Sequence, residues 1–351
     1  MRQRDRLLIC VATLVLVFAG ACTQEIKRPE PKFSGRLFVL SGDRTSGADL
    51  LEVAAAPDGS TNNYQVVTSG IREAVASQDQ KRLLYTIKDE IMLRDFATGG
   101  PAKSLVKADS FCLAWAPDAN HFSYKQKAGA TTKLYASDLE GKTKLVLDDP
   151  NPSTYCAQWI APDRLVFERF VGAATSKTGE QLKPNTTTVA TIGDPVKLKD
   201  TPRKWSLESV CAKNNVGFVR SADQGRLLIA KNIDHFETVD PSPAPCSECR
   251  FTGFAAQSCV PFFIEQPTST TTELFYLNPA NWQKQRPTSI TWTFSPNARM
   301  LIKSSARLMV VGDIPDKLLL IDTETGDVKP LLEKSATAGI QSPQPVVWIE
   351  N

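Results

Sequence analysis

Short apolar stretches alternate with polar turns along almost the whole chain after residue 35. One recurring pattern is an apolar strand, a tight turn that usually contains glycine, and a second apolar strand; it predicts a β-hairpin, because glycine permits the positive φ of tight hairpin turns. Copies of this pattern begin near residues 50, 91, 134, 187, 227, 274 and 318. Their spacing of about 40 to 54 residues is close to the period of four-stranded propeller blades.

A second pattern lies between the hairpins: an apolar stretch with Trp that ends in Pro followed by Asp or Asn. It occupies Leu113–Asp118, Gln158–Asp163 and Thr291–Asn297, and another apolar stretch follows each copy. This pattern resembles the TolB-like, WD40-like repeat. The resemblance covers roughly residues 35–351, although the segments 206–239 and 251–288 lack the Trp-Pro-Asp signature.

The resemblance implies an all-β fold, a single β-propeller over 35–351 with about seven four-stranded blades, six being possible. The C-terminal segment Val346–Ile349 is expected to be an innermost strand, and the N-terminal segments near Arg36–Leu40 and Leu50–Val53 lack one. Pairing of these segments would close the ring and leave no exposed sheet edge. The alternative is a β-sandwich followed by a smaller β domain.

The N-terminus has the pattern of a secretion signal over residues 1–21. Basic residues at 2, 4 and 6 precede the apolar run Leu7–Phe18, which is shorter than the ~20 residues of a membrane span. Ala19–Cys22 resembles the lipobox of bacterial lipoproteins, although that family prefers Leu where Ala19 stands. The resemblance implies lipid attachment at Cys22, a flexible tether over 22–34, and, because Thr23 replaces the retention signal Asp, the outer membrane. An ordinary secretion signal is the alternative.

Composition excludes one large class of partner. The net charge is +3, and removal of residues 1–21 takes away three basic residues and one acidic residue, leaving 38 basic against 37 acidic. A nucleic-acid-binding protein usually has a strong basic excess, so no nucleic-acid partner is expected.

Six cysteines remain after the signal segment and Cys22 are set aside, and an even number in an oxidising compartment indicates disulfides. Cys112 and Cys156 each stand three residues before the Trp of consecutive repeats, and equivalent positions of neighbouring innermost strands approach each other. The preferred set, one of fifteen connectivities, is Cys112–Cys156, Cys211–Cys259 and Cys246–Cys249. The Cys-x-x-Cys at 246–249 could instead serve redox or metal chemistry, but no second ligand pair follows it.

No catalytic, metal or cofactor site is predicted, because the chain has two histidines and no catalytic motif. The longer connections between blades are expected to gather at one rim, where Tyr155, Trp205 and Arg250 are candidate binding residues. The predicted function is that of a monomeric envelope lipoprotein, a non-catalytic scaffold for an envelope protein or a peptidoglycan-associated partner. The alternatives are a hydrolase or lactonase with an axial metal, and a propeller that binds a small ligand.

Overall fold

The computed structural model describes residues 32–55, 64–129, 131–149, 156–171, 184–244, 249–255, 258–266, 268, 271–295, 298–303, 305–313, 316–332 and 340–349. The chain divides into two compact units, Met1–Lys32 and Phe33–Asn351. The predicted signal segment, Cys22 and most of the predicted tether therefore lie outside the described residues. Within the described segments no helix is long and apolar enough to cross a bilayer.

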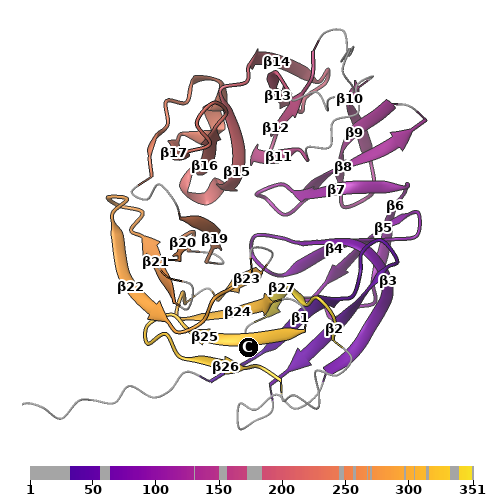
Figure 1. Ribbon diagram of the computed structural model, residues 1–351. Helices are drawn as coiled ribbons and strands as arrows, with labels where there is room; N and C mark the ends of the chain where they lie inside the picture. The colour runs from indigo at the N-terminus through magenta and orange to yellow at the C-terminus, as the bar shows by residue number, and fades with distance from the viewer. Residues whose placement is uncertain are drawn as a thin grey trace, which may run out of the picture. The chain divides into compact units, whose positions relative to one another are not determined.

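Unit Phe33–Asn351 is an all-β propeller, in which antiparallel four-stranded sheets follow one another in chain order (Figure 1). Sheets 1 and 2 share one long strand, β3 (Tyr64–Ala76), whose first half pairs with β2 and whose second half pairs with β4. Sheet 1 contains β27 (Gln344–Ile349), β1 (Arg36–Ser41), β2 (Ala48–Ala54) and the first half of β3. Sheet 2 contains the second half of β3, β4 (Arg82–Ile87), β5 (Glu90–Asp95) and β6 (Lys103–Lys107).

The five remaining sheets each use four consecutive strands. Sheet 3 is β7 (Ser110–Trp115), β8 (His121–Ala128), β9 (Thr131–Asp138) and β10 (Thr143–Asp149). Sheet 4 is β11 (Gln158–Ala161), β12 (Arg164–Arg169), β13 (Thr186–Thr191) and β14 (Lys197–Pro202). Sheet 5 is β15 (Trp205–Cys211), β16 (Val216–Ser221), β17 (Leu227–Lys231) and β18 (Ser242–Pro243), with short 3₁₀ turns η1 (Ala212–Asn214) and η2 (Ile233–Thr238). Sheet 6 is β19 (Arg250–Phe254), β20 (Pro261–Glu265), β21 (Thr272–Leu277) and β22 (Lys284–Ile290), and sheet 7 is β23 (Arg299–Ile302), β24 (Leu308–Asp313), β25 (Lys317–Asp322) and β26 (Val328–Pro330).

In every sheet the strand next to the innermost one is buried on both faces, mostly by apolar side chains, and its alternate residues pack against different neighbours. In β1, Leu37 and Val39 belong to a cluster shared with sheet 7, whereas Phe38 and Leu40 belong to a cluster shared with sheet 2. Every pair of consecutive sheets shares such a cluster in the described part of the chain, including sheets 7 and 1. This two-sided burial explains the nearly continuous apolar runs in the sequence, since a strand with one solvated face would alternate with polar residues.

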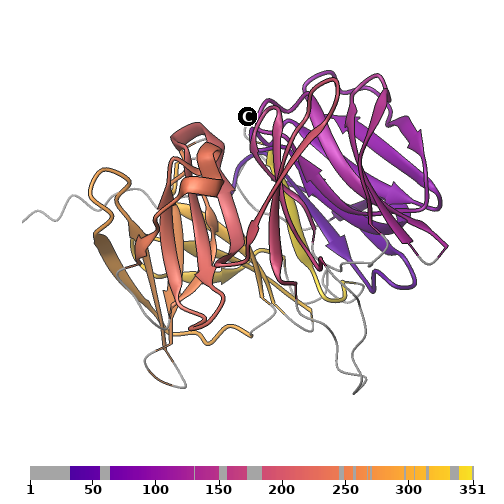
Figure 2. The same cartoon turned by 90° about the horizontal axis from the view of Figure 1, so that it is seen from above.

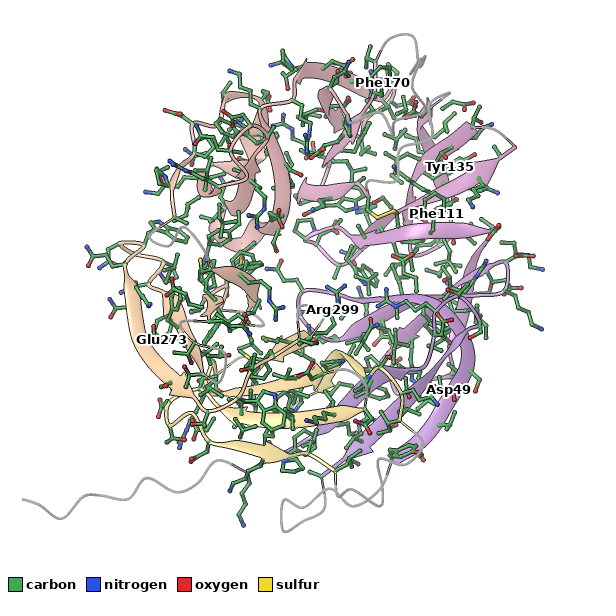
Figure 3. All side chains as sticks on the ribbon, viewed as in Figure 1. Asp49, Phe111, Tyr135, Phe170, Glu273 and Arg299 are labelled. Atoms are coloured by element: carbon green, nitrogen blue, oxygen red, sulfur yellow. A yellow bond between two sulfur atoms is a disulfide. The ribbon has the colours of Figure 1, made fainter. Side chains whose placement is uncertain are left out.

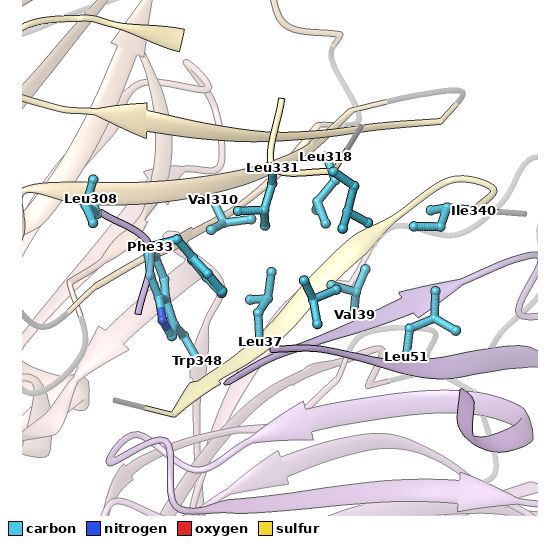
Figure 4. Packing of buried hydrophobic residues seen from close by; sticks show 12 residues of the cluster. Phe33, Leu37, Val39, Leu51, Leu308, Val310, Leu318, Leu331, Ile340 and Trp348 are labelled. Atoms are coloured by element: carbon cyan, nitrogen blue, oxygen red, sulfur yellow. The ribbon is translucent and has the colours of Figure 1, made fainter. Parts of the chain in front are cut away.

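The C-terminal strand is part of the first sheet. β27 pairs antiparallel with β1, with Trp348 opposite Leu37, so the two ends of the propeller unit lie side by side (Figures 1 and 2). Trp348 packs against Phe33 at 5.3 Å between ring centroids, and its indole N–H donates to the carbonyl of Ser34 at 2.8 Å (Figure 4). Phe33 and Ser34, which the sequence places in the tether, therefore belong to the folded unit.

One expected strand is absent from the described structure. Among the residues described in 291–297, Thr291 to Ser295 connect β22 to β23 rather than forming an innermost strand. Trp292 and the buried Phe294 pack into the cluster between sheets 6 and 7, and their carbonyls accept hydrogen bonds from Thr272 and Gln266. Side-chain packing thus holds this apolar segment without a strand partner, and the following segment Arg299–Ile302 is the innermost strand.

Lysines lie on the outermost strands of five sheets, at the edges where no further strand pairs. Charged residues at an exposed edge oppose pairing with another chain. The residues concerned are Lys103 and Lys107 in β6, Lys144 in β10, Lys197 and Lys199 in β14, Lys284 in β22 and Lys329 in β26.

Replacement of Trp348 by Ala should destabilise the propeller by about 3–5 kcal/mol, because it empties a buried site and removes the hydrogen bond to Ser34. The free energy of unfolding in urea measures the effect. Leu198→Ala, at an exposed position of β14, is the matched control and should change it by less than ~0.5 kcal/mol. Equal stabilities of the two variants would contradict the packing described for β27.

The pH dependence of stability should carry a contribution from Lys125, which is buried in β8. Burial lowers the pKa of Lys125 from 10.5 to about 8, although the carboxylate of Asp149 opposes the shift. Between these values the unfolded chain binds the proton and the folded chain does not, so stability rises with pH by up to ~3 kcal/mol. Lys125→Met removes this rise, as urea unfolding between pH 8 and 10.5 would measure. Parallel pH curves for the wild type and the variant would refute it.

Candidate binding cavity at the innermost strands

A cavity with a volume of about 420 Å³ lies where three innermost strands begin. Its walls come from the first residues of β19, β23 and β27 and from the turn between β1 and β2: Arg44, Arg250, Phe251, Thr252, Ala298, Arg299, Met300, Gln344, Pro345 and Val346. Arg299 lies towards the centre, around which the sheets are arranged (Figure 3). The volume is within the range of small-ligand sites.

Three arginines line this cavity, and each comes from a different sheet. Burial lowers the pKa of Arg250; the Asp313 carboxylate opposes this effect, and Arg299 adds to it. Burial likewise lowers the pKa of Arg44, with Glu73 opposing and Arg299 again lowering it. An arginine remains protonated at physiological pH, so these shifts report chiefly the free-energy cost of burying the two charges, with a smaller contribution from repulsion by Arg299.

Neutral oxygen atoms hold two of these guanidinium groups. Nη1 of Arg250 donates to the carbonyl of Ser295 at 3.0 Å, and the backbone N–H of Ser295 donates to Asp313 at 3.3 Å. Arg44 donates to the side-chain oxygen of Gln344, at the start of β27. Both contacts tie an arginine to the backbone or to a strand that forms the wall.

The pairing of these arginines differs from that of most others. Within the described residues, Arg44 and Arg299 form no ion pair, whereas many arginines elsewhere have a carboxylate oxygen within 4 Å. Those paired arginines are Arg36, Arg72, Arg82, Arg164, Arg169, Arg203, Arg220 and Arg307. Arg44 and Arg299 are therefore less directly compensated by carboxylates than these eight arginines.

Glu73 is the carboxylate that faces Arg44. It lies in β3 and accepts a hydrogen bond of 3.1 Å from the backbone N–H of Leu113, where a bulge interrupts the pairing of β7. Burial raises the pKa of Glu73, while the hydrogen bonds from Leu113 and Cys112 and the charge of Arg44 lower it. The carboxylate is thus held in place by the bulged strand, beside the cationic cavity.

The opposite ends of the innermost strands are bridged by the turn between β3 and β4. The amide of Gln78 contacts the sulfur atoms of Cys211 and Cys259 at 3.3 and 3.2 Å, and the side-chain oxygen of Gln80 accepts from the backbone N–H of Trp348 at 3.2 Å. One turn of sheet 2 thereby reaches sheets 1, 5 and 6. The cavity lies at the other end of these strands.

Of the two predicted rim residues that the structure describes, one lines the cavity. Arg250 does, as the first residue of β19. Trp205 begins β15 but packs against the cluster between sheets 4 and 5 and lines a separate cavity of about 130 Å³. Tyr155 lies outside the described residues. Sequence reasoning missed Arg44 and Arg299, although Arg299, like Arg250, is the first residue of an innermost strand.

Two disulfides join consecutive sheets. Cys112–Cys156 links sheets 3 and 4, and Cys211–Cys259 links sheets 5 and 6, as the sequence predicted. Cys249 is also disulfide-bonded, and its expected partner Cys246 lies outside the described residues. In the segments that the structure describes, no group of three or more His, Cys, Asp or Glu residues is placed to hold a metal ion.

No family model matches the chain, and no curated protein matches it. Among solved structures, a functionally unknown protein from Desulfotomaculum acetoxidans DSM 771 has a TM-score of 0.55 at 12% identity, covering 90% of this chain and 100% of that protein. An oligogalacturonate lyase in complex with manganese has a TM-score of 0.51 at 12% identity, covering 86% of each chain. TolB from Acinetobacter baumannii has a TM-score of 0.46 at 12% identity over 94% of this chain and 71% of TolB, which is too low to carry an argument. At these identities the likeness concerns the fold alone.

Replacement of Arg299 by Gln should stabilise the propeller by up to ~0.5 kcal/mol at low ionic strength, because it removes a cation that repels Arg44 and Arg250. The gain should shrink in 1 M salt, where the Debye length is ~3 Å. Arg226→Gln, at an exposed position outside the cavity, is the control and should show no comparable gain. An Arg299→Gln variant less stable than the wild type at every salt concentration would contradict the described repulsion.

Proposed function

We propose that this protein is a lipid-anchored, non-catalytic propeller of the bacterial cell envelope that binds a partner protein at the cavity end of its innermost strands. The observation that carries the proposal is the cavity itself, built by residues of three sheets and lined by three arginines. Charged side chains that destabilise the fold are often retained at functional sites, because selection for binding opposes selection for stability there.

The proposed location is supported by the N-terminal sequence and by the cysteines. The lipobox-like Ala19–Cys22 would attach the chain to a membrane by its N-terminus, and Thr23 after the cysteine favours the outer membrane. Disulfides persist in oxidising compartments such as the periplasm, and the bridges Cys112–Cys156 and Cys211–Cys259 are consistent with such a compartment.

The rigidity of the cavity supports binding of a partner. Its walls are strands of a packed scaffold, and two of its arginines, Arg250 and Arg44, are fixed by contacts to Ser295 and Gln344. A preorganised site loses little conformational entropy when it is occupied. The second candidate function is the binding of a small ligand, which the cavity volume of about 420 Å³ would admit.

A steric block of the cavity tests this function without a change of charge. Ala298, at the cavity wall, would be replaced by Trp, and Leu198→Trp on the exposed outer strand β14 is the matched control. Tagged wild-type protein and both variants would be cross-linked in detergent-solubilised envelope and analysed by mass spectrometry. We expect a partner to be captured by the wild type and Leu198→Trp and reduced at least about tenfold with Ala298→Trp, since a filled pocket excludes its anchor residue. Capture of the same proteins by all three would refute the proposal.

A further inference from the structure

We infer that the segment of the partner held in the cavity is an acidic peptide whose carboxylates bind between Arg44, Arg250 and Arg299. This inference rests on the proposed function, because it assumes that a partner enters the cavity. It adds the chemistry that would select that partner.

The charge balance of the site is the first argument. Three guanidinium groups face a concave space, whereas the carboxylates that oppose their pKa shifts within the described residues are Asp313 near Arg250 and Glu73 near Arg44. Arg299 lowers the pKa of both other arginines, so it repels each of them. An anionic ligand would relieve this repulsion, and a neutral or basic ligand would not.

The shape of the donor set is the second argument. A guanidinium group offers parallel N–H donors that match the two oxygens of a carboxylate. Arg250 and Arg299 begin neighbouring innermost strands, and Arg44 reaches the cavity from the β1–β2 turn. Donors spread over three elements suit a ligand with two or more carboxylates, as successive Asp or Glu side chains supply.

The wall between the arginines also favours a peptide over an inorganic ion. Phe251, Met300, Pro345 and Val346 contribute apolar surface to the cavity. Such surface can pack against the methylene groups of Glu side chains and against the peptide backbone, whereas phosphate has no group to place there.

Glu73 would oppose the incoming carboxylates. It faces Arg44 and the backbone N–H groups of Cys112 and Leu113. Glu73→Gln keeps a side-chain oxygen that can accept from Leu113 but removes the negative charge. The substitution should therefore strengthen the binding of an acidic peptide, which is the opposite of what structural damage would do.

The probe is a fluorescein-labelled, acetylated and amidated peptide with four consecutive Glu residues, and its Gln counterpart is the control peptide. Fluorescence anisotropy at neutral pH would measure binding to the full chain. We expect the Glu peptide to bind, with affinity that falls as salt rises, and the Gln peptide to bind at least about tenfold more weakly. Arg250→Gln and Arg299→Gln should each weaken binding about tenfold or more, Glu73→Gln should strengthen it, and Arg226→Gln should leave it unchanged.

Three results would overturn the inference: no binding of the Glu peptide, equal binding of the Glu and Gln peptides, or unchanged affinity in Arg250→Gln and Arg299→Gln. The cross-linking experiment separates this failure from failure of the proposed function. If Ala298→Trp loses the partner while both arginine variants keep it, the partner uses the cavity but not through carboxylates. If Ala298→Trp keeps the partner, the proposed function itself fails.

Discussion

In every sheet of this propeller the strand next to the innermost one is buried on both faces, so each sheet requires a packed neighbour on both sides. This constraint determines the role of the chain ends. Sheet 1 receives only three strands from the N-terminal part, and its cluster with sheet 7 is completed by Trp348 from β27 and by Phe33. Without β27, the backbone of β1 would be an unpaired edge. β24 lies close to the segment that leads into β27. A methyl group added at Gly312 in β24 would overlap the carbonyl of Pro343, just before β27.

The candidate site depends on the same arrangement. Its wall includes the first residues of β27, and the contact between Arg44 and Gln344 joins the two ends of the propeller unit. The sheet arrangement brings arginines from distant parts of the chain to one cavity, where burial of Arg44 and Arg250 and repulsion by Arg299 cost stability. The packing between the sheets offsets that cost. A rigid β scaffold can therefore hold a cationic site that a more flexible chain would relax.

Much of the fold could be predicted from the sequence, because its apolar repeats are local. Leu113–Asp118 and Gln158–Asp163 correctly marked the ends of β7 and β11 and the turns after them. The similar segment Thr291–Asn297 gave a wrong prediction of an innermost strand, because a connection whose side chains pack into the core has the same apolar pattern as a strand. The cavity had no local motif, since Arg44 and Arg299 are far apart in the sequence and only the sheet order brings them together. The sequence indicated Arg250 through its place at the end of a connection between blades and through its residue type, which is common in interfaces.

Amide hydrogen exchange along β27 tests the pairing of the two ends most directly. If the strand is held by β1 and by the cluster between sheets 7 and 1, the amides of Val347 and Trp348 should exchange about as slowly as the amides of β1 and β2. Exchange of the β27 amides orders of magnitude faster than exchange in β2 would show that the C-terminal strand detaches on its own. That result would contradict both the fold described for sheet 1 and the cavity built on it.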